Sequence, residues 1–352
     1  MKSILKWPGG KERELPIIRK YLPAYTGRFI EPFVGGGAVF FDTDNANCYI
    51  NDKSSELINL YSCIQNNDLE FKKYLQLENH EFSTLSKFID EHSEEILALY
   101  KSNIVVDTFI KNNIDIFSAI AQQFNNIFLS ELQKNLISKI KRSAKLEDTH
   151  GKISDADRIN NIEAAIKSAY YMYIRYLLNN SARLSQGQQA AVFFFIREYC
   201  YSSMFRYNAQ GDFNVPYGGI SYNRKDFTKK INYLFSAELA KKLAAAQISC
   251  NDFEPFLNGL NLTADDFIFL DPPYDSEFST YANNEFGTIE QTRLFHYLKN
   301  TPAKILLVIK NTDFIYSLYK NDFNITSFDK KYTVSFMSRN NQQAKHLLIT
   351  NY

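Results

Sequence analysis

Glycine and proline, the residues that interrupt regular structure most strongly, are almost absent from one long stretch of this chain. Between Leu57 and Asn208 there is no proline, and the stretch contains two glycines, Gly151 and Gly187. Apolar residues recur there three and four positions apart, which is the spacing of one face of an α-helix. Examples are Ile104, Phe109, Ile110, Ile114, Phe117 and Ile120, followed by Leu129, Leu132, Leu136, Ile137 and Ile140. The middle of the chain is therefore predicted to be a helical module.

The segments on either side have a different sequence pattern, in which short apolar runs end at glycine, proline or polar residues. Helices are predicted to begin near Ser54 and to cover 238–246, and the tail predicts a β-hairpin with arms at 332–337 and 346–349. We expect an α/β fold with a mostly parallel sheet and a terminal antiparallel hairpin, into which the helical module is inserted. The predicted strands are 28–33, 48–50, 247–250, 267–270 and 304–309.

The composition of the 352 residues excludes few classes of protein. Hydrophobic residues make up 45% and charged residues 22%, and the net charge of +1 neither favours nor excludes a nucleic-acid partner, because such partners bind local patches. The 29 Phe and 23 Tyr are many, and they fill a core or supply surfaces on which bases stack. The four Cys form no CxxC pair and the five His are dispersed, so no metal site is expected. No run of 18 apolar residues occurs, so we expect a reduced, cytoplasmic protein that does not enter a membrane.

The sequence Asp271-Pro272-Pro273-Tyr274 directly follows the predicted strand 267–270. Open α/β sheets bind ligands at the carboxyl ends of their strands. A carboxylate and a backbone carbonyl there can accept the two N–H bonds of an exocyclic amine, whose lone pair is otherwise delocalised into its ring. The two prolines stiffen the turn and donate no competing N–H, and Tyr274 can stack on a base. The alternative interpretation is a plain structural turn.

A glycine-rich turn follows the first predicted strand. Phe33-Val34-Gly35-Gly36-Gly37 allows close approach of a ligand to the backbone, and a helix is expected to begin after it with its N-terminus facing that ligand. Asp52 lies 17 residues beyond Gly35, at the end of the second predicted strand. This spacing is typical of an acidic residue that binds ribose hydroxyls. A tight strand–helix turn without a ligand is the alternative.

The sequence Trp7-Pro8-Gly9-Gly10-Lys11 lies near the N-terminus. It lacks the spacing of a phosphate-binding P-loop, and Glu12 follows the lysine. The Lys11 ammonium can instead meet a ligand carboxylate. The alternative is a loop that caps the core.

Taken together, these motifs resemble the DNA adenine methylase (Dam) family, the α group of amino-methyltransferases. The resemblance covers roughly residues 1–60 and 195–352, and the motifs occur in the order in which the family has them. They are 5–11 (LKWPGGK), 31–37 (EPFVGGG), 51–52 (ND), 205–208 (FRYN), 213–218 (FNVPYG) and 271–274 (DPPY).

The resemblance implies a Rossmann-like fold of the S-adenosylmethionine (SAM)-dependent methyltransferases, with SAM as the methyl donor and no metal. In the family these positions hold the cofactor, with Lys11 near its carboxylate, Asp52 on the ribose hydroxyls and Phe253 against the adenine. The residues expected to contact SAM are Trp7, Lys11, Phe33, Gly35, Gly37, Asp52, Phe253 and Asp271.

The resemblance also implies the reaction. Asp271, Pro272 and Tyr274 are expected to hold an adenine flipped out of duplex DNA, because an in-line methyl donor cannot reach N6 inside the base stack. The methyl group is then displaced directly onto N6, and catalysis rests on positioning and charge placement. No covalent enzyme intermediate is required.

A second set of matches concerns the target sequence. Arg206 matches an arginine that reads a guanine, and Tyr201 and Met204 match side chains that enter the helix beside the target. Lys6 matches a lysine that contacts the recognition site, and Asn208 is assigned to the same DNA-binding set. The alternatives are core packing for Tyr201 and Met204 and a solvated lysine for Lys6. GATC is the expected target.

One feature departs from compact members of the family. Asp52 and Arg206 are 154 positions apart, and the extra length is a helical insertion at about 80–190. This insertion carries a cluster of basic residues. The cluster could contact phosphates, form a solvated helix face, or bind a partner or a second copy of the chain. The cluster consists of Lys139, Lys141, Arg142 and Lys145.

We therefore predict a SAM-binding catalytic domain at 1–60 and 230–352 and a mostly helical target-recognition domain at 61–229. The expected partner is double-stranded DNA, with a cognate restriction endonuclease as a further candidate and a bacterial or phage cytoplasm as the setting. Two alternatives remain: a methyltransferase acting on RNA or a protein amide, and a catalytically silent DNA-binding regulator.

Overall fold

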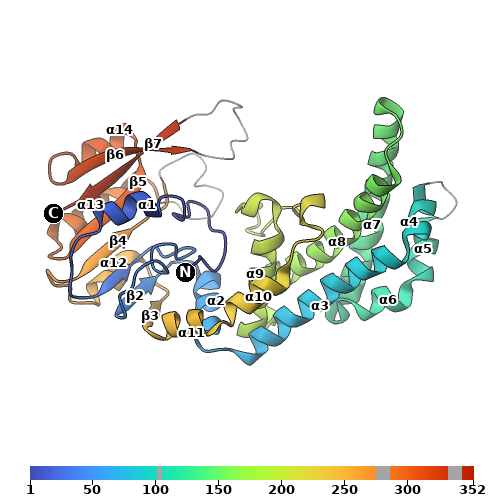
Figure 1. Cartoon of the computed structure of the whole chain (residues 1–352), viewed down its shortest axis with the longest axis horizontal. Coiled ribbons are helices and arrows are strands. Elements are labelled where there is room, and N and C mark those ends of the chain that lie inside the picture. The colour runs from blue at the N-terminus through green and yellow to red at the C-terminus, as the bar shows by residue number, and fades with distance from the viewer. Residues whose placement is uncertain (101–104, 275–285, 332–342) are drawn as a thin grey trace. The chain divides into compact units, whose positions relative to one another are not determined.

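A computed structural model describes residues 1–100, 105–274, 286–331 and 343–352 of the chain (Figure 1). The chain divides into two compact units. The sheet unit comprises Met1–Gln65 and Ser236–Tyr352, and the helical unit comprises Asn66–Phe235. The helical unit is thus inserted into the sheet unit, and each is described by itself.

The helical unit has the structure that its sequence predicts, because every regular element described in it is a helix. Asn113 separates α5 from α6, where the apolar spacing alone suggests one continuous helix. Its elements are α3 (Leu69–Glu91), α4 (Ser93–Tyr100), α5 (Val106–Asn112), α6 (Ile114–Ala119), η2 (Gln122–Phe124), α7 (Asn125–His150), α8 (Asp155–Asn179), η3 (Ser181–Arg183), α9 (Gln186–Tyr199), η4 (Tyr201–Ser203), η5 (Ile220–Tyr222) and α10 (Phe227–Leu234).

Aromatic side chains fill the core of the helical unit. The ring of Phe82 in α3 lies 4.5 Å from that of Tyr199 in α9, and Phe195 packs against both. A buried ion pair accompanies them: Lys167 Nζ lies 3.0 Å from Glu163 Oε1 and donates to Ser86 Oγ. Burial lowers the pKa of Lys167 to about 8. The dense aromatics of this region thus pack against each other in the core.

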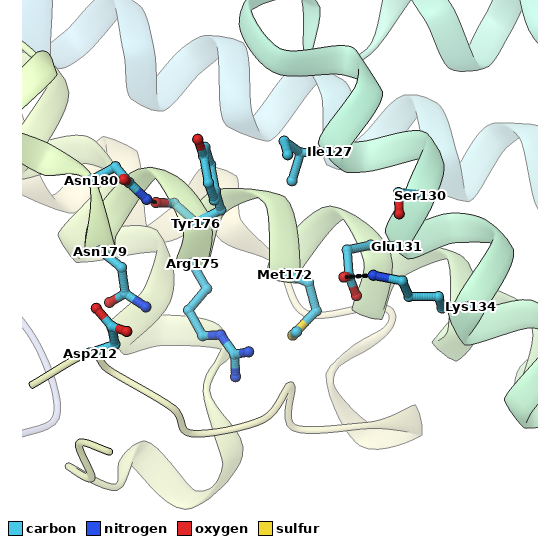
Figure 2. Close-up of a pocket in the computed structure, with 10 residues that line it drawn as sticks. All are labelled: Ile127, Ser130, Glu131, Lys134, Met172, Arg175, Tyr176, Asn179, Asn180 and Asp212. Atoms are coloured by element: carbon cyan, nitrogen blue, oxygen red, sulfur yellow. Dashed lines mark hydrogen bonds and ion pairs between the residues drawn. The ribbon is translucent and has the colours of Figure 1, made fainter. Parts of the chain in front are cut away.

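A groove of about 420 Å³ runs between α7 and α8 (Figure 2). In Figure 2 the guanidinium of Arg175 points away from its helix into the groove. The groove adjoins the segment after α9, because Asn179 accepts from the Phe213 backbone N–H at 2.9 Å. Its lining includes Ile127, Ser130 and Lys134 of α7, Arg175 and Asn179 of α8, and Asp212.

Seven strands form one sheet in the described part of the sheet unit, in the order β3-β2-β1-β4-β5-β7-β6. The first five strands in that order pair in parallel, and β7 is antiparallel to both β5 and β6. The expected α/β fold with a mostly parallel sheet and an antiparallel terminal pair is therefore confirmed. The strands are β1 (Phe29–Glu31), β2 (Cys48–Asn51), β3 (Ala246–Ser249), β4 (Phe267–Leu270), β5 (Lys304–Lys310), β6 (Asn324–Lys331) and β7 (Gln343–Thr350).

The terminal strands differ from their predicted positions. The arm predicted at 332–337 falls outside the described residues, and the arm predicted at 346–349 lies within β7. Its partner β6 has charged and polar residues such as Asp329 and Lys330 beside its apolar ones, so its sequence carries little apolar alternation. Pairing with β7 from Asn324 to Lys331 makes this segment a strand.

One expected helix is not formed. Residues 38–42 form consecutive turns instead of a helix after the glycine turn, with two α-type bonds, from Phe41 N–H to the Gly37 carbonyl at 2.8 Å and from Thr43 N–H to the Val39 carbonyl at 3.0 Å. Thr43 and Asn45 each accept a backbone N–H through the side chain, which favours turns over helix. The helix expected directly after the glycine turn is therefore not formed at 38–42.

The other two helices predicted in the sheet unit begin close to their predicted residues, one at Ser55 and the other at Ala237. The helix predicted at 238–246 ends two residues early, because Ala246 pairs with Cys48 and starts a strand. The helices described in the sheet unit are α1 (Leu15–Ile18), followed by η1 (Arg19–Tyr21), α2 (Ser55–Gln65), α11 (Ala237–Ala244), α12 (Phe253–Asn258), α13 (Thr288–Asn300) and α14 (Asp313–Tyr319).

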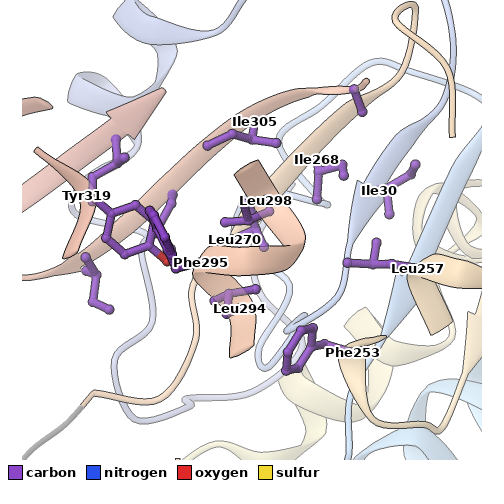
Figure 3. Close-up of a cluster of buried hydrophobic side chains, with 14 of the residues drawn as sticks. Ile30, Phe253, Leu257, Ile268, Leu270, Leu294, Phe295, Leu298, Ile305 and Tyr319 are labelled. Carbon is purple, nitrogen blue, oxygen red and sulfur yellow. The ribbon is translucent and has the colours of Figure 1, made fainter. Parts of the chain in front are cut away.

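The central strands are held by an apolar core on one face of the sheet (Figure 3). All four residues of β4 are buried, and Ile268 and Leu270 pack with Ile30 of β1 and Leu294 of α13. Burial of each such side chain contributes about 1.5–3 kcal/mol. The core therefore fixes where β1 and β4 end along the strand direction, and with it the positions of the loops that follow them.

Candidate active site

The strand order reverses direction between β1 and β4. From β1 the chain proceeds outward to β2 on one side, while β4 and β5 lie on the other. In open α/β sheets the crevice at the carboxyl ends of two such strands is where ligands bind. The loop after β1 carries the glycine turn, and the loop after β4 carries Asp271 to Tyr274. The two strongest sequence motifs thus meet at this point of the sheet.

Lys11 joins the N-terminal loop to the loop after β4. Its side chain is only 2% exposed, and its ammonium forms an ion pair with the Asp271 carboxylate. The same nitrogen donates to the Tyr274 hydroxyl at 2.9 Å and to the Gly9 carbonyl at 2.8 Å. A ligand carboxylate was expected near Lys11, and the structure supplies a protein carboxylate there. Three predicted site residues are brought into direct contact by this lysine.

The Tyr274 ring is oriented by two neighbours. The Lys11 ammonium lies 5.3 Å from its centroid, and the buried His346 of β7 lies 5.4 Å away. Burial raises the pKa of Tyr274 well above its usual value, and the Asp271 charge adds to this effect. The phenol therefore stays protonated and accepts the Lys11 hydrogen bond.

A second carboxyl group, that of Glu31 at the end of β1, is buried in the same region at 2% exposure. Burial raises its pKa well above the usual range, and the negative charge of Asp271 raises it further. Both effects disfavour ionisation of Glu31. The ion pair that Lys11 forms is with Asp271.

The glycine turn after β1 is shaped by contacts that exclude side chains. Gly35 has φ +48°, and a Cβ placed on it would lie 2.7 Å from Cδ1 of Trp7. Gly37 has φ +75°, and a Cβ there would lie 2.5 Å from the Tyr61 hydroxyl. That hydroxyl donates to the Gly35 carbonyl at 3.0 Å. The glycines therefore allow Trp7 and Tyr61 to brace the turn from two sides.

Asp52 is tied to the same turn. Its Oδ2 accepts from the Gly35 backbone N–H, and its Oδ1 accepts from that of Ser54, both at 3.0 Å. Burial raises the pKa of Asp52, although these two hydrogen bonds oppose the shift. Each carboxylate oxygen keeps a lone pair for a further donor. A sugar hydroxyl is a donor of this kind.

The rings of Phe33 and Phe253 come together, as two residues predicted for one site should. Their centroids lie 5.6 Å apart, and Phe286 packs against both. The Arg293 guanidinium lies 4.5 Å from the Phe253 centroid and is paired with Asp252 at 2.7 Å. Phe253 is only 2% exposed, so Phe33 is the more accessible of the two rings.

The predicted recognition segment lies in the helical unit and is held by Arg197. This arginine is buried at the end of α9, and its guanidinium donates to the backbone carbonyls of Ser203 and Met204. Ser202 and Ser203 have φ values of +51° and +52°, a strained conformation for residues with side chains. Tyr201 is 41% exposed and therefore not a core residue.

Arg206 lies in the short bridged segment that follows. Its Nε and Nη2 donate to the side-chain and backbone oxygens of Asn214 at 2.6 and 2.7 Å. The edge formed by Nη1 and Nη2 retains N–H groups for a further acceptor. Asn208 stabilises the turn that follows, because its side-chain oxygen accepts the backbone N–H groups of Gln210 and Asp212.

Two residues outside the predicted set of site residues fix the loops of the site. Asn51 donates to the carbonyls of Pro32 and Asn251 and accepts from the Asn251 N–H, so one amide links the loops after β1, β2 and β3. Gln291 of α13 is fully buried and donates to the Pro273 carbonyl at 3.0 Å. Asn51 belongs to the motif at 51–52, whereas Gln291 lies between Glu290 and Thr292 in sequence and carries no comparable signal.

None of the helices described is long and apolar enough to span a membrane. Among the residues that the structure describes, no three His, Cys, Asp or Glu side chains are grouped so that they could hold a metal ion.

The sheet order and its mostly parallel pairing define a Rossmann-like α/β fold, with the candidate site at the strand switch point. Comparison with known families then assigns the chain: the model of the D12 class N6 adenine-specific DNA methyltransferases matches residues 7–115 and 101–334. The chain belongs to this family, and it is a DNA adenine-specific methyltransferase.

Individual relatives agree with this assignment. The chain is 28% identical to the type II methyltransferase M.CviBI of Paramecium bursaria Chlorella virus NC1A over the whole of both chains. It is 27% identical to the type II methyltransferase M.MjaIII of Methanocaldococcus jannaschii over all of this chain and 99% of the relative. The DNA adenine methylase of Serratia marcescens is 24% identical over 89% of this chain and 84% of its own.

The contact of Gln291 with the Pro273 carbonyl generates a prediction. Gln291→Leu leaves that carbonyl without its buried donor, which costs about 1–3 kcal/mol and loosens the loop that holds Asp271 and Tyr274. We expect the methylation kcat to fall at least about tenfold, with a smaller change in the KM for DNA. Gln247→Leu, which removes an exposed hydrogen bond to Tyr49, is the matched control. A kcat equal to that of the control would show that Gln291 does not position the loop.

Proposed function

We propose that this methyltransferase transfers the methyl group of SAM to N6 of a flipped adenine in duplex DNA, with GATC as its target sequence. The observation that carries the proposal is the contact of Lys11 with Asp271 and Tyr274 at the switch point. The family assignment supports the reaction class. The donor, the target sequence and the roles of individual residues are the proposed part.

The residues around the glycine turn fit SAM. Asp52 offers carboxylate oxygens to ribose hydroxyls, and Phe33 offers a partly exposed ring to the adenine. Gly35 and Gly37 let the turn pack closely against Trp7 and Tyr61. The remaining residues proposed to hold SAM are Trp7, Lys11, Phe253 and Asp271. When bound, SAM supplies a methyl group on a positively charged sulfur, which is open to attack by an amine.

The loop after β4 is proposed to hold the target base. The Asp271 carboxylate and the Pro272 carbonyl accept the two N6–H bonds, so the lone pair of the amine is directed at the methyl donor. Tyr274 stacks on the purine. Lys11 orients the Asp271 carboxylate through the ion pair, and burial of the cluster strengthens these electrostatic contacts.

Recognition of the sequence is proposed to lie mainly in the helical unit. Arg206 presents its free edge to a guanine, and the exposed Tyr201, together with Met204, enters beside the target. Asn208 shapes the turn that follows Arg206. Lys6 is exposed in the sheet unit and is proposed to contact the same site on DNA.

The two units are proposed to divide the work accordingly, with SAM binding and catalysis in the sheet unit and target recognition in the helical unit. Three relatives bear the name type II methyltransferase. This supports, as a further proposal, a cognate restriction endonuclease whose cleavage the methylation blocks.

Sequencing of N6-methyladenine tests the proposed function directly. The chain is expressed in a host without adenine methylation, beside an Asp271→Ala variant that lacks the proposed acceptor of the N6–H bond. We expect the wild-type chain to methylate one short motif and the Asp271→Ala variant to methylate none. Methylation at GATC supports the proposed target, a different motif overturns it, and equal methylation in both strains overturns the role of Asp271.

The raised pKa of Asp52 generates a prediction about cofactor binding. Hydroxyl donors favour the ionised carboxylate, so SAM affinity should fall as the pH is lowered toward the raised pKa of Asp52 and the group becomes protonated. Asp52→Asn should bind SAM at least about tenfold more weakly at pH 7 and should lose this pH dependence. Calorimetric titrations between pH 5 and pH 8 measure both, with Asp44→Asn as the control. Retention of the pH dependence in Asp52→Asn would assign it to another group.

The free edge of Arg206 generates a prediction about specificity. Arg206→Ala should reduce discrimination by about 1–3 kcal/mol at a single base pair of the target. Methylation rates on duplexes substituted at each position in turn measure this, and Arg183→Ala serves as a control on the same unit. Equal loss at every position would make Arg206 a phosphate contact instead.

A further inference from the structure

One feature of the helical unit has no part in the proposed reaction. The second half of α7 carries four cationic residues, which we call the α7 cation cluster: Lys139, Lys141, Arg142 and Lys145. Lys141, Arg142 and Lys145 are exposed and Lys139 is half-buried. Among the described residues, no member of the cluster forms an ion pair. Four positive charges thus occur within seven residues of a chain whose net charge is +1.

The acids nearest in sequence form no ion pair with the cluster. Glu131 pairs with Lys134 at 3.1 Å, Glu147 pairs with Arg158 at 2.7 Å, and Asp148 forms no ion pair with a described residue. Burial lowers the pKa of Lys139, and the charge of Arg142 lowers it further. The like charges of the cluster therefore repel each other, and no described carboxylate is paired with them.

This arrangement is unfavourable for the helix that carries it. Like charges three and four positions apart destabilise a helix by about 0.2–0.5 kcal/mol per pair. Packing offers little in return, because Ser143 is the single buried residue of α7 beyond Leu136. The cluster is therefore not explained by the stability of the helical unit. An anionic partner would supply the negative charge that compensates it.

Two members of the cluster, Lys141 and Lys145, continue the face of α7 that lines the groove. At about 100° per residue, Lys134, Lys141 and Lys145 fall within about 40° of the helix circumference. Ile127 and Lys134 from that face line the groove, into which Arg175 of α8 also points (Figure 2). From Lys134 to Lys145 the face is about 16 Å long, at about 1.5 Å per residue. That length matches roughly five base-pair steps of about 3.4 Å.

We propose that the α7 cation cluster binds the sugar–phosphate backbone of duplex DNA outside the target sequence. The proposal rests on the proposed function insofar as duplex DNA is the substrate. Charge complementarity favours DNA over a protein partner, because lysine is depleted from protein interfaces while phosphate contacts rely on lysine and arginine. Such contacts add affinity without sequence information. The insertion therefore enlarges the DNA footprint and leaves the target unchanged.

The test compares two triple variants with the same change in charge. One is Lys141→Gln/Arg142→Gln/Lys145→Gln, which keeps good helix formers and relieves the repulsion within α7. The control is Lys20→Gln/Lys241→Gln/Lys320→Gln, which neutralises three exposed lysines of the sheet unit. DNA binding is measured without SAM, by fluorescence anisotropy at several salt concentrations. The duplexes carry the methylated motif with either short or long flanks.

We expect the α7 variant to bind the long duplex at least about tenfold more weakly than the control does. The slope of log affinity against log salt should fall by about 2.7, because each phosphate contact contributes about 0.9. On a duplex that contains little beyond the motif the two variants should bind alike. Sequencing should find the same methylated motif for both.

Other outcomes would overturn the proposal. Equal salt slopes for the two variants would exclude phosphate contacts by the cluster. A changed motif would make the cluster part of sequence recognition, and a change in mass by light scattering without a change in DNA affinity would make it a contact between copies. Because binding is read without turnover, an absence of methylation by the wild-type chain would refute the proposed function and leave this comparison readable.

Discussion

The parallel pairing of β1 with β4 is the constraint on which the rest of the site depends. The two strands are more than 230 positions apart in sequence, yet Phe29 pairs with Phe267 and Ile30 with Ile268. Because both strands run in the same direction, their carboxyl ends lie at one edge of the sheet. The glycine turn and the loop of Asp271 to Tyr274 are adjacent for this reason. The apolar core beneath them holds the register, since a shift of one residue would turn buried side chains outward.

Polar contacts then hold the loops that this strand pairing brings together. Lys11 binds Asp271 and Tyr274, and its burial makes the ion pair sensitive to the loss of either partner. Asn51 and Gln291 secure the backbone of the loops from behind. The site is therefore organised from inside the sheet unit before any ligand binds, as catalysis by positioning requires.

The helical unit applies the same physics to a different task. Its core of packed aromatic rings and the buried Lys167–Glu163 pair support a strained loop at Ser202 and Ser203, which Arg197 holds through two carbonyls. Strain of this kind persists where surrounding contacts over-determine the backbone. The α7 cation cluster has the opposite character, because no described residue forms an ion pair with it. The loop at Ser202 and Ser203 is thus held by internal contacts, while the cluster on α7 presents its charge to solvent.

Much of this protein follows from the sequence alone. Local patterns predict the strand at 267–270, the helical insertion and the family motifs, because periodicity and turn residues act over a few positions. They fail at β6, which is a strand because β7 pairs with it, and at 38–42, where local side-chain hydrogen bonds favour turns over the expected helix. The sequence by itself determined which chemical groups are present and at which strand ends they lie. Only the tertiary structure decided that Lys11 meets Asp271, because that contact depends on the order of strands in the sheet and not on spacing along the chain.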